Sequence, residues 1–307
     1  MEVVQIVEKL KQLGFSENIE NEIKRYDEPH RFYHNIEHIQ KMLNSAKEQG
    51  ILSNDLFLSI VFHDIIYNPK ENNNEELSAE LFYSYLKVDY IKQAILETKT
   101  HKPTSLLSMQ LCDLDLSVLR EDYESFMDFE NKIFKEYQFV DCKTYKIKRL
   151  EILSNLGVKN EYLNYVKYRT PSIAVYAGSF NPFHKGHYDV LLKAEQIFDK
   201  VIIARGFNPD KNNKIVELPK QIQNRQIEVY SGLLTDFIDN LGYDVTLVRG
   251  LRNANDLQFE LTQYRFLQDL NPKIKIVSLF CDKQYEHISS SAIRNLEKYN
   301  KQDKYLL

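Results

Sequence analysis

Tryptophan is absent from the 307 residues, and cysteine, glycine and proline are scarce, at 3, 9 and 8 residues. The cysteines show no Cys-x-x-Cys spacing, which argues against a disulfide framework and fits a reducing compartment. So few glycines and prolines make long flexible linkers unexpected. No apolar run reaches membrane-spanning length. The charge-mixed, amphipathic opening MEVVQIVEKLKQLGF lacks the apolar stretch of a signal peptide. We therefore expect a cytoplasmic protein that does not enter a membrane.

The charge balance is equally modest. A net charge of −4 gives no reason to expect nucleic-acid binding. Hydrophobic residues make up 43% and charged residues 27% of the chain, which is typical of a globular protein. The length is sufficient for two ordinary domains.

The two halves of the chain differ in their hydrophobic period. Before residue 168 apolar residues recur at spacings of three and four, as in LFLSIVFHDII and ELSAELFYSYL, which predicts eight or nine helices. After residue 171, short apolar runs bounded by turn residues predict buried strands that alternate with helices, notably a helix over 253–270. We predict an all-α domain over 1–168 and an α/β, Rossmann-like domain with a parallel sheet over 171–307. The expected strands are SIAVYAG (172–178), VIIAR (201–205), IEVY (227–230), YDVTLVRG (243–250) and KIKIVSLF (273–280).

The segment AGSFNPFHKGHYDV joins the first expected strand to a helix. A helix N-terminus after a strand and loop can receive a phosphate group, and His184 and His187 would flank it. A zinc site is an alternative, but it needs two further ligands, and no Cys/His pair at ligand spacing lies nearby. A third alternative is a histidine pair in the core or on the surface without function.

These motifs resemble a known superfamily. GSFNPFHKGH is similar to the HxGH signature of the nucleotidylyltransferases. Three further segments resemble phosphopantetheine adenylyltransferase: RGLRNANDLQFE (249–260), EHISSSAIR (286–294) and NPDKN (208–212). In that family a substrate-facing lysine occurs at the position of NPDKN. The four segments follow in the family's order over residues 172–298.

The resemblance implies adenylyl transfer from ATP, accompanied by Mg²⁺, to the phosphate of a small acceptor. A phosphate nucleophile needs no general base, so positioning and charge neutralisation carry the reaction. The implied catalytic residues are His187 on the α-phosphate, His184 on the neighbouring phosphates, and the cations Lys211 and Arg249. The implied nucleotide- and substrate-binding residues are Gly178, Ser179, Phe180, Arg252, Glu260, Ile288, Ser289, Ser290 and Ser291. Singly, ISSS could be a plain helix cap and the arginines a solvated rim.

This sequence departs from the family pattern mostly on the acceptor side. Asn181 replaces Asp, Phe259 replaces Tyr, Leu267 stands where a polar Asn is expected, and the helix before residue 227 is short. The resemblance favours 4′-phosphopantetheine as the acceptor, giving dephospho-coenzyme A and pyrophosphate. GSFNP also occurs in nicotinamide-mononucleotide adenylyltransferases, which supply the alternative acceptor.

Histidines and aspartates gather in four segments of the helical half: RFYHNIEHI (31–39), FHDIIY (62–67), THKP (100–103) and CDLDLSVL (112–119). This order resembles the HD-domain metal-dependent phosphohydrolases. The resemblance implies a divalent transition metal (Mn, Fe, Ni or Zn), which suits imidazole and carboxylate ligands and would activate water. The implied ligands are His34, His63, Asp64 and one of Asp113 and Asp115, and substrate phosphate or a second metal would contact Arg31, His38 and His101. Alternatively, the HD dipeptide is incidental and His38 is merely packed in a helix.

Together the halves predict a bifunctional enzyme with ATP and a small phosphorylated acceptor as partners. The alternative is a transferase whose helical half is a non-catalytic, nucleotide-sensing module. Related transferases are often oligomers, so a homo-oligomer is compatible with the sequence.

Overall fold

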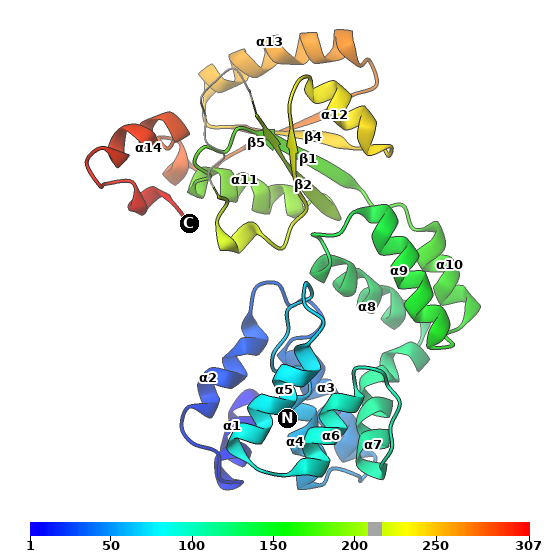
Figure 1. Ribbon diagram of the computed structural model, residues 1–307. Helices are drawn as coiled ribbons and strands as arrows, with labels where there is room; N and C mark the ends of the chain where they lie inside the picture. Colours follow the sequence, from blue (N-terminus) through cyan, green and yellow to red (C-terminus); the bar gives the residue numbers. More distant parts are fainter. Residues whose placement is uncertain (208–216) are drawn as a thin grey trace. The chain divides into compact units, whose positions relative to one another are not determined.

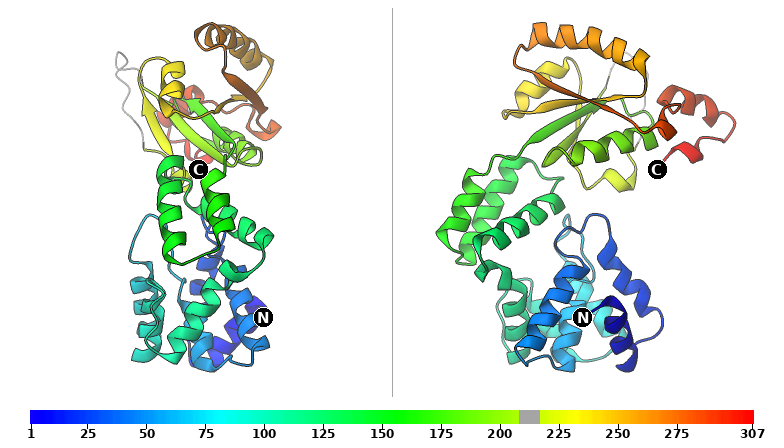
Figure 2. Two further views of the ribbon diagram at one scale, coloured as in Figure 1. Left: turned by 90° about the vertical axis from the view of Figure 1, so that its right-hand side faces the viewer. Right: turned by 180° about the vertical axis from the view of Figure 1, so that it is seen from behind.

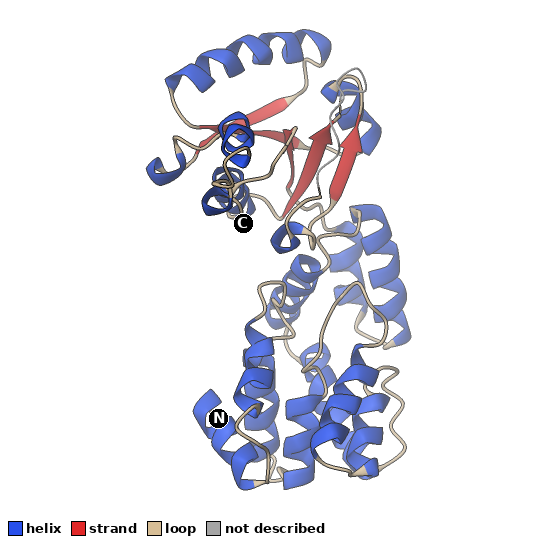
Figure 3. Cartoon of the chain, turned by 60° about the vertical axis from the view of Figure 1, so that its left-hand side comes forward, coloured by secondary structure: helices blue, strands red, loops and turns tan. Residues whose placement is uncertain are grey.

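The structure is a computed structural model that describes residues 1–207 and 217–307, so the predicted Lys211 lies outside the described residues. The chain forms two compact units. One comprises residues 1–136 and 149–167, and the other comprises residues 137–148 and 168–307. Strands, red in Figure 3, occur in the second unit alone within the described ranges.

Before residue 171, the described chain is helical, as predicted (Figure 1). It contains ten α-helices, more than the expected eight or nine, partly because the five-residue α2 is a separate helix. The helices and 3₁₀ turns are α1 (Val3–Gln12), α2 (Ile19–Ile23), η1 (Lys24–Asp27), α3 (Ile36–Glu48), α4 (Asn54–Phe62), α5 (Asn74–Tyr85), α6 (Asp89–Glu97), α7 (Leu106–Asp115), η2 (Leu116–Arg120), α8 (Tyr123–Glu136), α9 (Cys142–Asn155) and α10 (Asn160–Tyr168). Across the part of the chain that the structure describes, no helix combines the length and apolarity that crossing a membrane would require.

Helix α4 is the centre of the helical unit. It begins at the N-cap Ser53, whose hydroxyl accepts from the backbone N–H of Leu56 at 3.1 Å. Every residue from Leu56 to Phe62 is buried, as expected for a helix that is apolar all round. Helices α3, α5, α6 and α7 contact it. Its C-terminal end therefore delivers His63 and Asp64 into a surrounded position.

The second unit contains a parallel five-stranded sheet in the order β3-β2-β1-β4-β5, which confirms the predicted α/β organisation. The strands coincide with the predicted runs to within three residues at each end, and the predicted helix over 253–270 is α13. The strands are β1 (Ile173–Gly178), β2 (Lys200–Gly206), β3 (Ile227–Tyr230), β4 (Thr246–Leu251) and β5 (Lys275–Phe280). The helical elements are α11 (Lys185–Glu195), η3 (Lys220–Ile222), α12 (Leu234–Leu241), α13 (Ala254–Leu270), η4 (Lys283–Tyr285), α14 (Ser290–Glu297) and η5 (Asp303–Tyr305).

Helices cover both faces of this sheet (Figure 2). On one face Val190 and Leu191 of α11 pack against alternate strand residues such as Tyr176. On the other face Ile238 of α12 and Leu267 of α13 pack against the intervening strand residues. This three-layer arrangement places ligands outside the carboxyl ends of the strands, where the order reverses between β1 and β4.

A buried lysine ties residues 137–141 to the sheet. Nζ of Lys200, at the start of β2, donates to the carbonyl oxygens of Gln138 at 2.5 Å and Val140 at 2.7 Å. Burial lowers the pKa of Lys200 to about 8. These contacts explain why residues 137–148 group with the sheet, although the predicted boundary lay near residues 168–171.

Candidate functional site

His184 and His187 lie against each other at the N-terminus of α11. His184 is the N-cap, and its Nδ1 accepts from the backbone N–H of His187 at 3.3 Å. Nδ1 of His187 accepts from the backbone N–H of His184 at 3.3 Å, and the rings stack with centroids 3.5 Å apart. Because each Nδ1 is an acceptor, each neutral ring carries its proton on Nε2. Two N–H donors therefore stand at a helix N-terminus, a position that favours phosphate.

Both imidazoles are neutral near pH 7. Burial, followed by the charge of Arg252, lowers the pKa of His184 to about 4. Burial, followed by His184 and Arg252, lowers the pKa of His187 well below its ordinary value. Gly186 lies between them, and a Cβ there would come within 3.3 Å of the His184 ring. The motif thus needs a small residue between two neutral donors.

Phe180 shapes the loop before α11. Its backbone is left-handed (φ 45°), and its buried ring covers Gly178, where a Cβ would lie 2.9 Å from the ring. The ring also packs edge-on against His187, with centroids 5.1 Å apart. The intervening Ser179 is exposed. The three residues predicted to bind nucleotide therefore form the junction between β1 and the paired histidines.

A cavity opens beside this junction, at the carboxyl ends of β1, β4 and β5. It brings together seven of the predicted residues with others from α11 and α13. Its lining is Tyr176, His184, Gly186, His187, Val190, Gly250, Leu251, Arg252, Asp256, Phe259, Glu260, Cys281, Ile288, Ser289 and Ser290. Position 250 favours glycine, because a Cβ on this residue would lie 3.1 Å from the Val190 side chain. Sequence analysis did not assign Tyr176 or Cys281, since neither belongs to a motif.

The two arginines of RGLR are held by carboxylates of α13. Arg249 forms a two-point pair with Glu260, through Nε–Oε2 at 2.6 Å and Nη2–Oε1 at 3.0 Å. Arg252 pairs in the same way with Asp256, at 2.8 Å for each bond. Neither arginine is a plain solvated rim, because both are fixed in orientation. The signal for Asp256 was its position four residues after Arg252 at a helix start.

The ISSS segment begins α14. Ser289 is the N-cap, and its Oγ accepts from the backbone N–H of Ala292 at 3.2 Å. Ser290 donates to the carbonyl oxygen of Pro182 at 3.0 Å. Oγ of Ser291 lies 3.3 Å from Oγ of Ser289. The segment is thus a helix cap, and it also brings a second helix N-terminus to the cavity.

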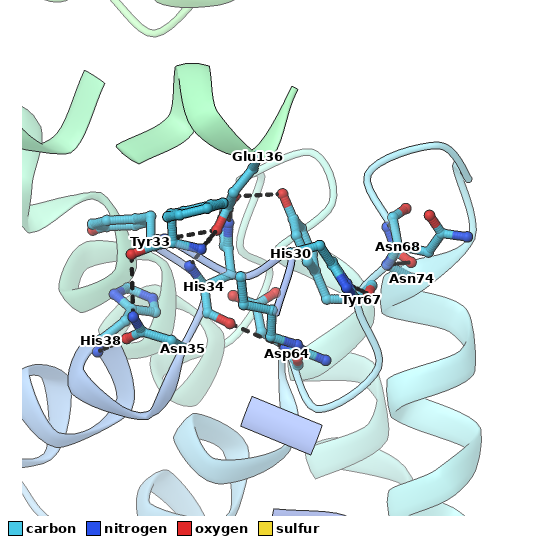
Figure 4. A network of polar contacts seen from close by, with 12 residues as sticks. His30, Tyr33, His34, Asn35, His38, Asp64, Tyr67, Asn68, Asn74 and Glu136 are labelled. Atoms are coloured by element: carbon cyan, nitrogen blue, oxygen red, sulfur yellow. Dashed lines mark hydrogen bonds and ion pairs between the residues drawn. The ribbon is translucent and has the colours of Figure 1, made fainter. Parts of the chain in front are cut away.

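The helical unit gathers a second set of polar residues, and Figure 4 shows the polar network that includes His34, His38, Asp64 and Glu136. Ligand atoms of His38, His63, Asp64 and Asp115 all lie within 4.8 Å of one another. Asn35 caps α3 by accepting from the N–H groups of Glu37 and His38, which sets His38 in the first turn. Asp115 is the last residue of α7. The ends of α4 and α7 and the start of α3 therefore converge on one point.

His63 carries the strongest indication that this group holds a cation. Its Nδ1 donates to the carbonyl oxygen of Ile60 at 2.8 Å, so a neutral ring has a bare lone pair on Nε2. That Nε2 is buried without a hydrogen-bond partner in the described ranges. Oδ2 of Asp64 lies 3.0 Å away and Oδ1 of Asp115 lies 3.7 Å away. Although burial lowers the pKa of His63, Asp64 and Asp115 raise it well above its ordinary value, so a proton on Nε2 faces the two carboxylates when no metal is bound. The donor set suits a divalent transition metal, which would replace that proton.

The protonation state of the two carboxylates, Asp64 and Asp115, is compatible with cation binding. Burial alone would raise the pKa of Asp115, but hydrogen bonds from His101 and His38, together with the nearby His63 imidazole, hold it well below its ordinary value. Burial also raises the pKa of Asp64, but the neighbouring His63 imidazole lowers it by more, so the pKa lies below its ordinary value. Both carboxylates are therefore ionised at pH 7, as ligands must be.

His34 was predicted as a ligand, but the structure places it outside this group. Its Nδ1 lies 2.6 Å from Oε2 of Glu136, which also accepts from the Tyr67 hydroxyl at 2.7 Å. The other oxygen of Glu136 accepts from three successive backbone N–H groups, those of residues 32–34. His38, predicted as a substrate contact, lies in the group instead. Glu136 belongs to none of the sequence motifs and lies 102 residues from His34, so the sequence analysis did not identify it.

The structure also places three further residues of the prediction. Asp113 is exposed and pairs with Arg120 at 2.9 Å, so Asp115 is the aspartate of the group. Arg31, predicted to contact substrate, has a fully buried side chain. It donates to the carbonyl oxygens of His34, Asp64 and Ile65, and so fixes the backbone around the site. His101 contacts Asp115 directly, with Nε2 2.9 Å from Oδ2.

Comparisons with known proteins concern the second, C-terminal unit (residues 137–148 and 168–307). A family model described as cytidylyltransferase-like matches residues 175–296. Phosphopantetheine adenylyltransferase of Clostridium tetani is 34% identical over 137 residues, which is 42% of this chain and 85% of that protein. The enzyme of the same name from Mycoplasma capricolum is 35% identical over 138 residues, covering 42% of this chain and 99% of that protein.

One solved structure is also similar, a bifunctional NMN adenylyltransferase/ADP ribose pyrophosphatase from Francisella tularensis. It is 18% identical, with a TM-score of 0.30, over 45% of this chain and 44% of that one. At this score it supports neither a fold nor an activity. The curated relatives, in contrast, are matched over most of their length, and the chain therefore belongs, through its C-terminal unit, to the phosphopantetheine adenylyltransferase family.

Proposed function

We propose that the C-terminal unit is an adenylyltransferase that uses ATP, accompanied by Mg²⁺, and a small phosphorylated acceptor. The observation that carries this proposal is the pair of Nε2–H donors of His184 and His187 at the N-terminus of α11, beside a cavity at the switch point of the sheet. An acceptor phosphate oxygen attacks the α-phosphorus of ATP. The bond from that phosphorus to the bridging oxygen breaks, and pyrophosphate leaves.

The residues take distinct roles in this reaction. His187 donates from Nε2 to the α-phosphate as charge develops there, and His184 donates to the adjacent phosphates. Arg252 and the N-terminus of α14, at Ser289–Ser291, receive the β- and γ-phosphates. Arg249, held by Glu260, keeps Nη1 for the acceptor phosphate, since that nitrogen has a long 3.4 Å contact with the carbonyl of Ala177. Lys211 would add positive charge around the reacting and leaving phosphate groups.

The acceptor we propose is 4′-phosphopantetheine, which would give dephospho-coenzyme A and pyrophosphate. Relatives bearing that activity in their names support it. The departures at Asn181 and Phe259 bear on the acceptor side, whereas Leu267 packs against the sheet. A missing polar partner in an acceptor site costs about 1–3 kcal/mol, which weakens binding without naming another acceptor.

Pyrophosphate release and product mass, measured with ATP and each acceptor, test the assignment. Higher kcat/KM with 4′-phosphopantetheine than with nicotinamide mononucleotide supports it. The reverse order overturns the acceptor but leaves adenylyl transfer standing. Absence of pyrophosphate release with both acceptors overturns transfer to either of them.

A second function is proposed for the helical unit because ligand atoms of two histidines and two aspartates lie within 4.8 Å of one another. We propose that His38, His63, Asp64 and Asp115 hold a divalent transition metal (Mn, Fe, Ni or Zn) in a phosphohydrolase site. Such a metal would lower the pKa of bound water and polarise a phosphoester. With Nδ1–H donated to Glu136, His34 carries a proton on Nε2 in its imidazolium form, which the pair with Glu136 favours by raising the pKa of His34, and this proton is available to a leaving group.

Metal content of the purified chain tests this site. Wild type and Asp113→Asn, the matched control on the same helix, are expected to bind one equivalent, while His63→Ala and Asp115→Asn lose it. Hydrolysis of bis-p-nitrophenyl phosphate by the loaded wild type, but not by His63→Ala, would support a hydrolase. Metal binding without hydrolysis of this or other phosphoesters would favour the nucleotide-sensing alternative.

A further inference from the structure

The carboxylate of Asp115 is held from both sides by imidazoles. Oδ1 lies 3.1 Å from Nε2 of His38 and 3.7 Å from Nε2 of His63, so this oxygen belongs to the four-residue group. Oδ2 lies 2.9 Å from Nε2 of His101. The two oxygens of one carboxylate therefore have different partners.

His101 occupies a strained backbone conformation. Its φ is 49°, in the left-handed region that residues with a Cβ rarely adopt. Strain of this kind persists where the surrounding structure over-determines it, and it concentrates at functional sites. Here the conformation turns the imidazole, whose side chain is 22% exposed, onto Asp115.

The loop that carries His101, between α6 and α7, is fixed at both of its ends. Glu97, at the end of α6, accepts from the backbone N–H of Thr104 at 2.8 Å and from its hydroxyl at 2.6 Å. Ser105 and Ser108 form a reciprocal capping box at the start of α7. The loop therefore holds the position of His101 even before any ligand arrives.

We propose that His101 is a positioning residue that holds Asp115 as a one-oxygen ligand, an inference that rests on the metal centre proposed above. By donating to Oδ2, it leaves Oδ1 directed at His38, His63 and the metal, and it prevents the carboxylate from rotating to chelate through both oxygens. Such partners of a ligand typically change metal affinity by about 10–100-fold when removed. His101 is not itself a ligand in this arrangement, because it meets the oxygen that faces away from the group.

Two substitutions separate this role from a structural one. His101→Gly removes the imidazole and also relieves the left-handed backbone, since glycine adopts it freely. His101→Gln keeps an N–H donor at a similar reach from the backbone. Asn300→Gly is the matched control, because Asn300 has φ 53° but belongs to the other compact unit of the chain.

The experiment measures Mn²⁺ affinity of the full-length chain by calorimetry, and the metal-free melting temperature of each variant. His101→Gly is expected to weaken Mn²⁺ binding about 10–100-fold with a melting temperature at or above that of wild type. His101→Gln is expected to recover most of the affinity, and Asn300→Gly to bind as wild type. Equal affinity in wild type and His101→Gly, whatever the melting temperature, overturns the proposal.

Pulsed EPR of the Mn²⁺-loaded chain then counts coordinated imidazoles. Two in both wild type and His101→Gly support a positioning role. Three in wild type and two in the variant would make His101 a direct ligand and overturn it. If wild type binds no Mn²⁺ and contains no metal, the proposed centre itself fails, whereas binding that is insensitive to His101 removes this inference alone.

Discussion

Nδ1 of His34 lies 2.6 Å from Oε2 of Glu136, so an imidazole and a carboxylate separated by 102 residues form one buried pair. Burial disfavours the charged form of both groups, but the attraction between the His34 imidazolium and the Glu136 carboxylate is stronger than this effect. The pKa of His34 is raised by Glu136, and the pKa of Glu136 is lowered by His34. Glu136 is therefore ionised at neutral pH, the pair favours the protonated form of His34, and Glu136 also accepts from the Tyr67 hydroxyl.

Glu136→Gln is expected to destabilise the helical unit by about 2–4 kcal/mol, because it leaves a buried partner uncompensated. If the glutamine oxygen accepts from the backbone N–H groups of residues 32–34, its NH2 group faces the Tyr67 hydroxyl and Nδ1 of His34, where the carboxylate accepted from both. Urea denaturation followed by circular dichroism measures the loss. Glu121→Gln is the control, since the pair between Glu121 and Lys41 is partly exposed, with Lys41 53% accessible, and is expected to contribute at most about 1 kcal/mol. Equal losses in the two variants would contradict the prediction.

Arg249→Lys is expected to raise KM for the acceptor about 10–100-fold while leaving KM for ATP within a few-fold. A lysine has one charged nitrogen. It cannot keep the two-point pair with Glu260 and also present a fixed donor to a phosphate. Steady-state kinetics with each substrate varied in turn measure the split. Arg265→Lys, on the exposed side of the same helix α13, serves as the control and should change neither constant.

Acid is expected to destabilise the C-terminal unit through His184. The pKa of this residue falls from 6.5 to about 4 on folding, so between these values the unfolded chain binds more protons than the folded one. Stability therefore rises with pH across this window and is lost on acidification, by up to about 1.4 kcal/mol per pH unit. Urea denaturation from pH 4 to 7.5 should give a shallower pH dependence for His184→Asn than for wild type. The exposed His287→Asn should leave the slope unchanged.

The sequence predicted the sheet well because each strand is a short apolar run bounded by turn residues. It also picked out residues that the structure brings together at one cavity, because HKGH, RGLR and ISSS each lie within a single junction between elements. These signals are local, so no knowledge of packing was needed to find them.

The group of His38, His63, Asp64 and Asp115 was harder to predict, because its members meet only through packing of α3, α4 and α7. A signal for Asp115 over Asp113 did exist: Asp115 shares a helix face with the buried Leu111, four residues earlier, while Asp113 does not. The choice of His38 over His34 depends on where α3 starts, which the Asn35 cap decides. Glu136 had no local signal at all.

The last prediction concerns the transition state of adenylyl transfer. His187→Asn is expected to lower kcat by about 10²–10³-fold with little change in ATP affinity, because the lost donor acts on charge that develops only during reaction. Asparagine retains an oxygen near the position of Nδ1, so it can still accept from the backbone N–H of His184 and preserve the cap, while the Nε2 donor disappears. Single-turnover kinetics and equilibrium ATP binding separate the two effects. His287→Asn is the control, and a kcat within a few-fold of wild type in His187→Asn would remove this residue from the chemistry.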